Sequence, residues 1–141
     1  MTNVVAIQDV RETMAAKKEH LEAVYSLTRL QDALIVNLDV TGLMENLNAR
    51  QAYLDAVDDL ELRLPDRRTL LMNHECAQLA VEINDVIDRI QKLDAHNQQK
   101  ARDCLVFLKG QTKKASEGRR AGTGYDNRPA DMGATYFDSK K

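Results

Sequence analysis

The chain has 141 residues, of which 43% are hydrophobic and 30% are charged, with no tryptophan and only two prolines. This length fits one domain, since domains commonly contain about 100 to 150 residues. The composition favours an exposed helical bundle over a β-sandwich or barrel. The formal net charge of −2 excludes the domain-wide basic field that dedicated duplex-binding proteins carry.

The N-terminal residues do not resemble a targeting segment. Residues 1–8 have a short apolar patch but neither a basic start nor a long apolar core, as a secretory signal would require. No window approaches the roughly 20 apolar residues of a membrane span. We therefore expect a cytosolic protein without membrane insertion, unless it is exported by a route that leaves no cleavable signal.

Cys76 and Cys104 are interpreted as small apolar residues of one helix rather than as a disulfide pair.

The first expected helix covers about residues 9–38, because Asp9 and Glu12 favour its start and apolar residues then recur at helical spacing. Residues 39–42 interrupt the pattern, and we interpret Asp39 as the N-cap of a second helix over about residues 40–64. A bent but continuous helix is the alternative. The second helix has a seam with alternating spacings of three and four, namely Val40, Leu43, Leu47, Arg50, Leu54, Val57, Glu61 and Leu64.

The third expected helix covers residues 66–109, which lie between Pro65 and Gly110 and contain neither glycine nor proline. At about 1.5 Å per residue this helix would be on the order of 65 Å long. Its heptad seam is apolar at first, is interrupted by Asn97 and Lys100, and then becomes apolar again. The seam positions are Met72, Cys76, Leu79, Ile83, Val86, Ile90, Leu93, Asn97, Lys100, Cys104 and Phe107.

Pro65 ends the second helix and Asp66 can cap the third, and this short connection makes the third helix antiparallel to the second. The prediction is an all-α, elongated, antiparallel three-helix bundle with one long C-terminal helix. The second helix is short, so the third should draw level with its start near Ile90. Roughly 20 residues, or about 30 Å, would then project beyond the first turn. Four residues on that projection would lack a partner in their own chain and are predicted to bind a partner protein: Cys104, Leu105, Phe107 and Leu108. The alternatives are that a second copy covers this strip as a homodimer, or that the C-terminal tail folds back over it.

Residues 110–141 are expected to form a flexible tail, because they hold five of the six glycines and cannot bury enough apolar surface to fold alone. Their charge is +3, against −5 for residues 1–109. Three aromatic residues in this polar setting are predicted to contact partners, namely Tyr125, Tyr136 and Phe137. A basic cluster is interpreted as a solvated linker in preference to a nucleic-acid site; it consists of Lys113, Lys114, Arg119 and Arg120.

No group of residues predicts catalysis, a metal or a cofactor. The segment that begins with His74 and Glu75 starts like a zinc-protease helix, but Gln78 stands where the second histidine ligand would be needed. The acidic group Asp55, Asp58, Asp59 and Glu61 is interpreted as a solvated helix face. Gly122 and Gly124 flank a threonine without the lysine of a phosphate loop. We therefore expect a binding protein rather than an enzyme.

Residues 38–60 resemble the FlgN family of bacterial flagellar export chaperones. The resemblance rests on an acidic residue that starts the second helix, on leucines, and on a basic-plus-Gln pair before another apolar heptad; these are Asp39, Leu43, Leu47, Arg50, Gln51 and Leu54. The ending of the chain, Tyr136-Phe137 followed by acidic and basic residues, is similar to that of some members. Ser139 stands where a basic residue would be expected.

The resemblance implies a cytosolic chaperone that holds hook-associated flagellar proteins unassembled and delivers them to the flagellar type III export gate. The residue patterns alone predict only a binding module with an overhanging apolar helix. A generic coiled-coil tether or assembly adaptor is the alternative function, and nucleic-acid binding through the tail ranks third.

Overall fold

The structure, a computed structural model, describes residues 2–119 and, of these, the side chains of residues 7–115. The described residues form four helices and no strand: α1 (Thr2–Val36), α2 (Val40–Glu61), α3 (Arg67–Leu71) and α4 (His74–Arg119). The prediction of an all-α fold is confirmed. None of these helices combines the length and the apolar character that crossing a membrane requires.

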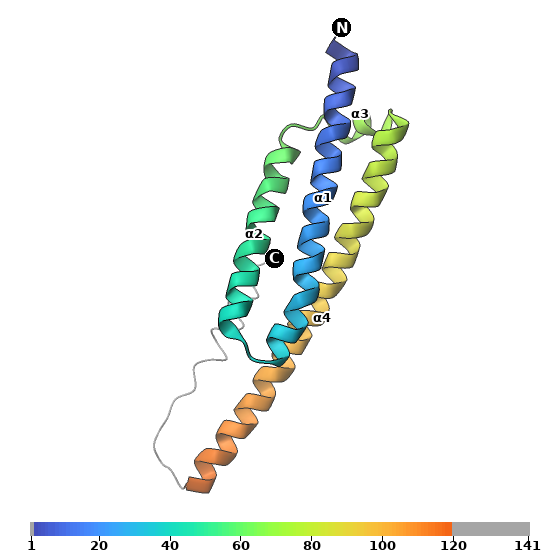
Figure 1. Ribbon diagram of the computed structural model, residues 1–141. Helices are drawn as coiled ribbons and strands as arrows, with labels where there is room; N and C mark the ends of the chain where they lie inside the picture. Colours follow the sequence, from blue (N-terminus) through green and yellow to red (C-terminus); the bar gives the residue numbers. More distant parts are fainter. Residues whose placement is uncertain (1, 120–141) are drawn as a thin grey trace.

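The three long helices lie side by side in an elongated arrangement (Figure 1). α1 and α4 run in the same direction and α2 runs in the opposite one, with α1 in contact with both neighbours. No Cα atom of α2 lies within 8 Å of a Cα atom of α4. α1 therefore packs more closely against the other two long helices than they pack against each other.

The turn between α1 and α2 is closed by hydrogen bonds at both helix ends. Asp39 N donates to Leu34 O at 2.9 Å and Leu38 N donates to Ile35 O at 3.0 Å, the bonding pattern of a Schellman motif. Asp39 also accepts a hydrogen bond from Gly42 N at 2.9 Å, so it is the N-cap of α2 as predicted. α1 and α2 are thus separate helices, and the alternative of one bent helix is wrong.

The main apolar core lies in the half of the structure that contains the start of α4. Eight buried residues form it, and each contributes roughly 1.5 to 3 kcal/mol of burial energy if it is a large aliphatic side chain. They are Met14, Leu21 and Val24 of α1, Val57 of α2, and Cys76, Ile83, Val86 and Ile90 of α4. The last four are positions of the predicted seam, so the heptad pattern is confirmed over this stretch.

The prediction of one unbroken helix over residues 66–109 is wrong at both ends. Asp66 caps only the five-residue helix α3, and a second cap, Asn73, begins α4 by accepting a hydrogen bond from Cys76 N at 3.0 Å. Met72 lies between the two helices and is 82% exposed, so it is not a seam residue. At the far end, α4 continues through Gly110 to Arg119. A single glycine costs a helix only about 1 kcal/mol relative to alanine, and no proline lies between Gly110 and Arg119 to stop it.

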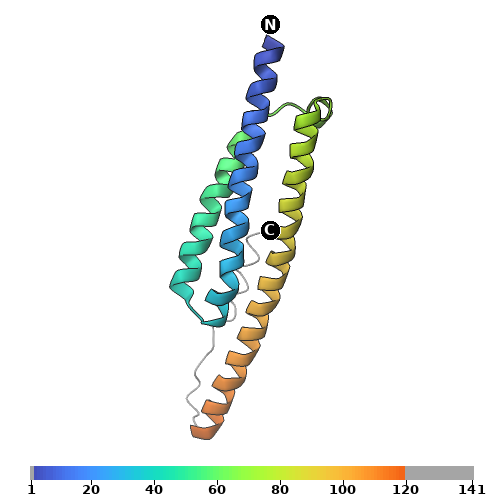
Figure 2. The same ribbon diagram turned by 45° about the vertical axis from the view of Figure 1, so that its right-hand side comes forward.

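This shift changes how far α4 projects. α4 reaches the α1–α2 turn near Cys104, beside Ile35, rather than near Ile90. Part of this difference arises because α4 begins at His74 rather than at Asp66. Its last residues run past the turn in both views (Figures 1 and 2). The projecting part is residues 109–119, or about 16 Å of helix, about half of the predicted length.

Candidate functional site

An apolar groove of about 120 Å³ lies where α4 passes the α1–α2 turn. We call it the turn groove. It is lined by Leu34, Ile35, Leu38, Asp39, Val40, Leu43, Ala101, Cys104, Leu105 and Leu108. Apart from Asp39, which caps α2, all of these are uncharged. The groove is therefore a surface that can accept an apolar side chain and that offers no acid-base group.

The structure divides the four predicted partner-binding residues of α4. Leu105 and Leu108 are half-buried in the turn groove, and Cys104 Sγ lies 3.9 Å from Ile35 O. The prediction that these three lack a partner in their own chain is therefore wrong. Phe107 is 64% exposed, and its neighbour Val106 is 69% exposed.

The geometry of a straight helix explains this division. Relative to an exact seven-residue repeat, a straight α-helix drifts by about 20° per heptad. From Cys76 to Cys104 there are four heptads, so the seam turns by about 80°. Phe107 is thereby rotated outward, while Leu105 and Leu108 are rotated toward the α1–α2 turn. The heptad pattern alone could not predict this, because it does not say whether the helices supercoil.

Leu38 forms part of the groove wall from a strained backbone position. Its φ of 57° lies in the left-handed region, where glycine is the usual residue at the end of a helix. For a residue with a Cβ atom this conformation costs roughly 1 to 2 kcal/mol. Strain of this kind is often kept where a side chain serves a function. Here the side chain lines the turn groove and is 51% exposed.

A layer of buried amides separates the turn groove from the main core. One side chain comes from each long helix: Gln31, Asn46 and Asn97 are 2%, 7% and 2% exposed. Gln31 Nε2 donates to Asn46 Oδ1 at 3.0 Å, and Asn97 Nδ2 donates to Gln31 Oε1 at 3.3 Å and to Thr28 O at 2.9 Å. A buried amide in a helical seam typically fixes the register of the helices at a cost in stability. Asn97, which interrupts the apolar seam of α4, therefore takes part in the packing of α4 against α1.

Beside this layer, Arg50 of α2 and Asp94 of α4 form a two-bond ion pair. Arg50 Nη1 and Nη2 donate to the two carboxylate oxygens of Asp94 at 2.6 and 2.8 Å. The Arg50 side chain is 6% exposed and that of Asp94 is 29% exposed. Sequence analysis placed Arg50 in the seam of the second helix, where a charged residue interrupts the apolar pattern. The structure shows it buried and bridging the two helices whose backbones do not touch.

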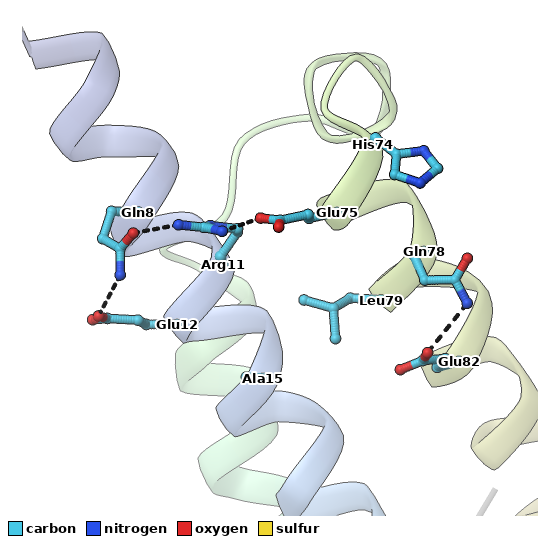
Figure 3. A pocket seen from close by; sticks show the side chains of 9 residues that line it. All are labelled: Gln8, Arg11, Glu12, Ala15, His74, Glu75, Gln78, Leu79 and Glu82. Atoms are coloured by element: carbon cyan, nitrogen blue, oxygen red, sulfur yellow. Dashed lines mark hydrogen bonds and ion pairs between the residues drawn. The ribbon is translucent and has the colours of Figure 1, made fainter.

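A second, charged groove of about 590 Å³ lies between the starts of α1 and α4 (Figure 3). Its polar side chains are largely bonded to one another. Arg11 donates to Gln8 and pairs with Glu75, and Gln78 Nε2 donates to Glu82 at 3.2 Å. The pair between Arg11 and Glu75 ties α1 to α4, whereas the other two bonds lie within a single helix. Among the residues that the structure describes, no three His, Cys, Asp or Glu side chains are grouped to hold a metal ion.

Next to this charged groove, Lys18 Nζ lies 3.0 Å from Glu82 Oε1. This hydrogen bond raises the pKa of Lys18 and lowers the pKa of Glu82. The pair lies on the surface and joins α1 to α4. Burial raises the pKa of the Cys76 thiol, so this cysteine of the core is held in its neutral form.

The remaining residues that sequence analysis singled out divide between described and undescribed parts of the chain. Tyr125, Tyr136 and Phe137 lie outside the described residues. Lys113 and Lys114 are exposed on α4, so the expectation that they belong to a linker is wrong. The acidic residues Asp55, Asp58 and Asp59 are exposed on α2.

Sequence reasoning missed Leu38 of the turn groove and, at the other end of α4, the N-cap Asn73. Leu38 carries no signal, since nothing in a sequence pattern predicts a leucine with a positive φ. Asn73 did carry one, because an asparagine just before an apolar-periodic stretch is a typical N-cap.

Comparison of the chain with protein-family models, with curated proteins and with solved structures found no match.

Proposed function

We propose that this protein is a cytosolic export chaperone of the FlgN type, which binds hook-associated flagellar proteins and prevents their assembly before type III export. In this proposal the three long helices act as one elongated bundle that presents the far end of α4 to the client. Residues 110–141, with Tyr125, Tyr136 and Phe137, supply further client contacts or a docking signal for the export gate.

The observation that carries the proposal is an exposed apolar pair beside an apolar groove. Val106 and Phe107 are both more than 60% exposed. The turn groove lies on the adjoining face of the same helical turns, and Leu105 and Leu108 form one of its walls. Large apolar side chains in this setting are typical of protein interaction sites. An amphipathic client helix would lay its apolar face over Phe107 and place one side chain in the groove.

The resemblance of residues 38–60 to the family adds the flagellar part of the proposal. In the structure these residues make up the α1–α2 turn and nearly all of α2, so they form one side of the turn groove. Asp39 and Leu43 both belong to the resemblance and to the groove lining. The residues that carry the resemblance thus include part of the candidate site.

Replacing Phe107 by alanine tests the client site. We expect the affinity for the terminal segment of a hook-associated protein, measured by isothermal titration calorimetry, to fall by at least about 2 kcal/mol, or roughly thirtyfold. Thermal stability should barely change, because the side chain is 64% exposed. Val81→Ala is the matched control: Val81 is also on α4 and is 63% exposed, but it lies far from the groove.

If Phe107→Ala and Val81→Ala bind the client equally well, the client site lies elsewhere on the bundle. If the protein binds no hook-associated protein at all and only associates with itself or joins two other proteins, the tether alternative holds. A second copy covering Phe107 in the free protein is compatible with the proposal only if the client displaces it. Sedimentation of the free protein and of its mixture with the client distinguishes these cases.

A further inference from the structure

The end of the bundle opposite the turn groove has a second concave surface, of about 700 Å³. We call it the link pocket, because the link between α2 and α4 forms one side of it and the start of α1 forms another (Figure 1). Val10, Leu64 and Leu70 pack against the main core at its base, together with the buried Cys76. The base is therefore firmly anchored to the rest of the protein.

The rim of the link pocket is apolar and open. Met72 and Ile7, which line it, are 82% and 42% exposed, and Leu62 just before it on the link is 84% exposed. The short helix α3 has no buried residue, and among the helices its backbone approaches only α4. The link thus leaves large apolar side chains uncovered, although a compact turn of this length has no need of them.

Three arginines stand on the same link. Arg63, Arg67 and Arg68 are exposed, and none of them forms an ion pair with a described residue. Two nearby cations differ in this respect, since Arg11 pairs with Glu75 and Lys17 pairs with Glu61.

The carboxylates around the link pocket are mostly occupied. Asp66 accepts the capping hydrogen bond from Thr69 N at 2.8 Å, and this bond lowers the pKa of Asp66. Asp9 is the one carboxylate among the residues that line the pocket, and Arg63 lines it as well. Of the three exposed arginines, Arg63 lines the apolar concavity, whose lining holds a single acidic group, and Arg67 and Arg68 follow on α3.

We propose that the link pocket is a second protein-binding surface, which takes an acidic amphipathic helix of a partner protein. Leucine-like side chains of that helix enter the pocket over Leu64 and Leu70, and its carboxylates pair with Arg63, Arg67 and Arg68. A helix with apolar residues at i, i+3 and i+4 presents both features on adjoining faces. This surface lies at the other end of the protein from the turn groove and does not depend on the proposed export role.

The shape and chemistry of the surface favour this occupant over others. An anionic membrane is flat and cannot fill a concavity, and an apolar pocket has no use in binding a phosphate backbone. A second copy of this chain offers Asp55, Asp58 and Asp59 on α2, with Leu62 one helical turn further and 84% exposed, so a dimer is the competing occupant and the oligomeric state is measured in the test. Charge complementarity of this kind mainly sets specificity and the rate of association.

The test uses the full chain and a synthetic helical peptide with leucine at i, i+3, i+4 and i+7 and glutamate at the flanking positions. A second peptide has the same leucines with lysine in place of glutamate. We expect the glutamate peptide to bind in a salt-dependent manner by fluorescence anisotropy and the lysine peptide not to bind. The triple variant R63E/R67E/R68E should weaken binding by about tenfold or more, since three exposed ion pairs are lost together.

Two further variants separate binding from folding. Met72→Glu changes a residue that is 82% exposed, so it should fold normally and still weaken peptide binding. Arg102→Glu reverses an exposed charge near the opposite end of α4 and should leave binding unchanged. Circular dichroism checks the helicity of every variant.

Four outcomes would overturn the proposal. The first is that the glutamate peptide does not bind, and the second is that it binds the triple variant, or the Met72→Glu variant, as tightly as the original protein. The third is that the protein binds vesicles of anionic phospholipid through these arginines but not the peptide. The fourth is that the free protein is a dimer that R63E/R67E/R68E converts to a monomer.

Discussion

Removing the carboxylate of Asp94 should destabilise the protein far more than removing an ordinary surface carboxylate. In the Asp94→Ala variant the Arg50 guanidinium loses both of its bonds, at 2.6 and 2.8 Å, while its side chain stays only 6% exposed. Breaking a buried ion pair from one side typically costs about 3 to 5 kcal/mol. The 29% exposure of Asp94 lets water reach the arginine, which lowers the expected cost to about 2 to 3 kcal/mol.

The matched control is Asp88→Ala, which breaks the pair between Asp88 and Lys92 on the same helix. These side chains are 57% and 77% exposed, so the pair contributes only about 0.3 to 0.5 kcal/mol. Both variants gain the same helix propensity from alanine, roughly 0.5 kcal/mol, so this gain cancels in the comparison. We therefore expect Asp94→Ala to be less stable than Asp88→Ala by about 2 kcal/mol.

The assay is urea unfolding followed by circular dichroism at 222 nm, since the chain has no tryptophan. The double variant Arg50→Met/Asp94→Ala should recover most of the lost stability, because no unpaired charge then remains buried. This recovery is a coupling energy that a double-mutant cycle measures directly. If Asp94→Ala and Asp88→Ala unfold within about 0.5 kcal/mol of each other, the bond between Arg50 and Asp94 is not a buried interaction in solution.

Two further predictions concern surface charge and the groove wall. Because the hydrogen bond from Lys18 lowers the pKa of Glu82, the folded protein binds fewer protons at Glu82 than the unfolded chain does. The stabilisation that the ionised Glu82 contributes is therefore complete above about pH 4.3 and is lost as the pH falls through the pKa of Glu82 in the folded protein. The raised pKa of Lys18 has the opposite sign, and its contribution is lost only as the pH rises above about 10.4. Denaturation curves measured from pH 7 to pH 3 should therefore show the free energy of unfolding of the original protein approaching that of Glu82→Gln. A difference in unfolding free energy that stays constant over this range would contradict the prediction. Leu38→Gly relieves the positive-φ strain but adds chain entropy to the unfolded state, so we expect its stability to stay within about 1 kcal/mol of the original. Its client affinity should fall as the groove loses a wall, and calorimetry showing unchanged affinity would remove Leu38 from the site.

Local sequence signals identified most of the helix ends that have a cap. Asp39 and Asp66 were both read as N-caps, and both accept the expected backbone hydrogen bond. The break at Asn73 was missed because a continuous heptad pattern runs through it. That pattern places Met72 in the seam, yet Met72 is exposed. A cap can end a helix even where the hydrophobic spacing would allow it to continue, since capping and packing act on different parts of the chain.

The structure separates the partner-binding residues predicted on α4 onto different faces of the helix. From the sequence, Leu105, Phe107 and Leu108 appeared equivalent. In the structure, Leu105 and Leu108 line the turn groove, while Phe107 does not line it and is 64% exposed. The difference arises from two quantities that no pattern contains: where α4 starts relative to α1, and how far the seam drifts around a straight helix.

What the sequence determined by itself is the all-α class, the Asp39 cap and the core positions of α4 from Cys76 to Ile90, because helical periodicity and capping are local properties. Only the tertiary structure decided that Arg50 is buried against Asp94, that three amides form one layer, and that Leu38 helps to form a groove. Each of these joins residues at least 15 positions apart. Such pairings depend on the register between helices, which is set by the sum of all contacts along them rather than by any short stretch of chain.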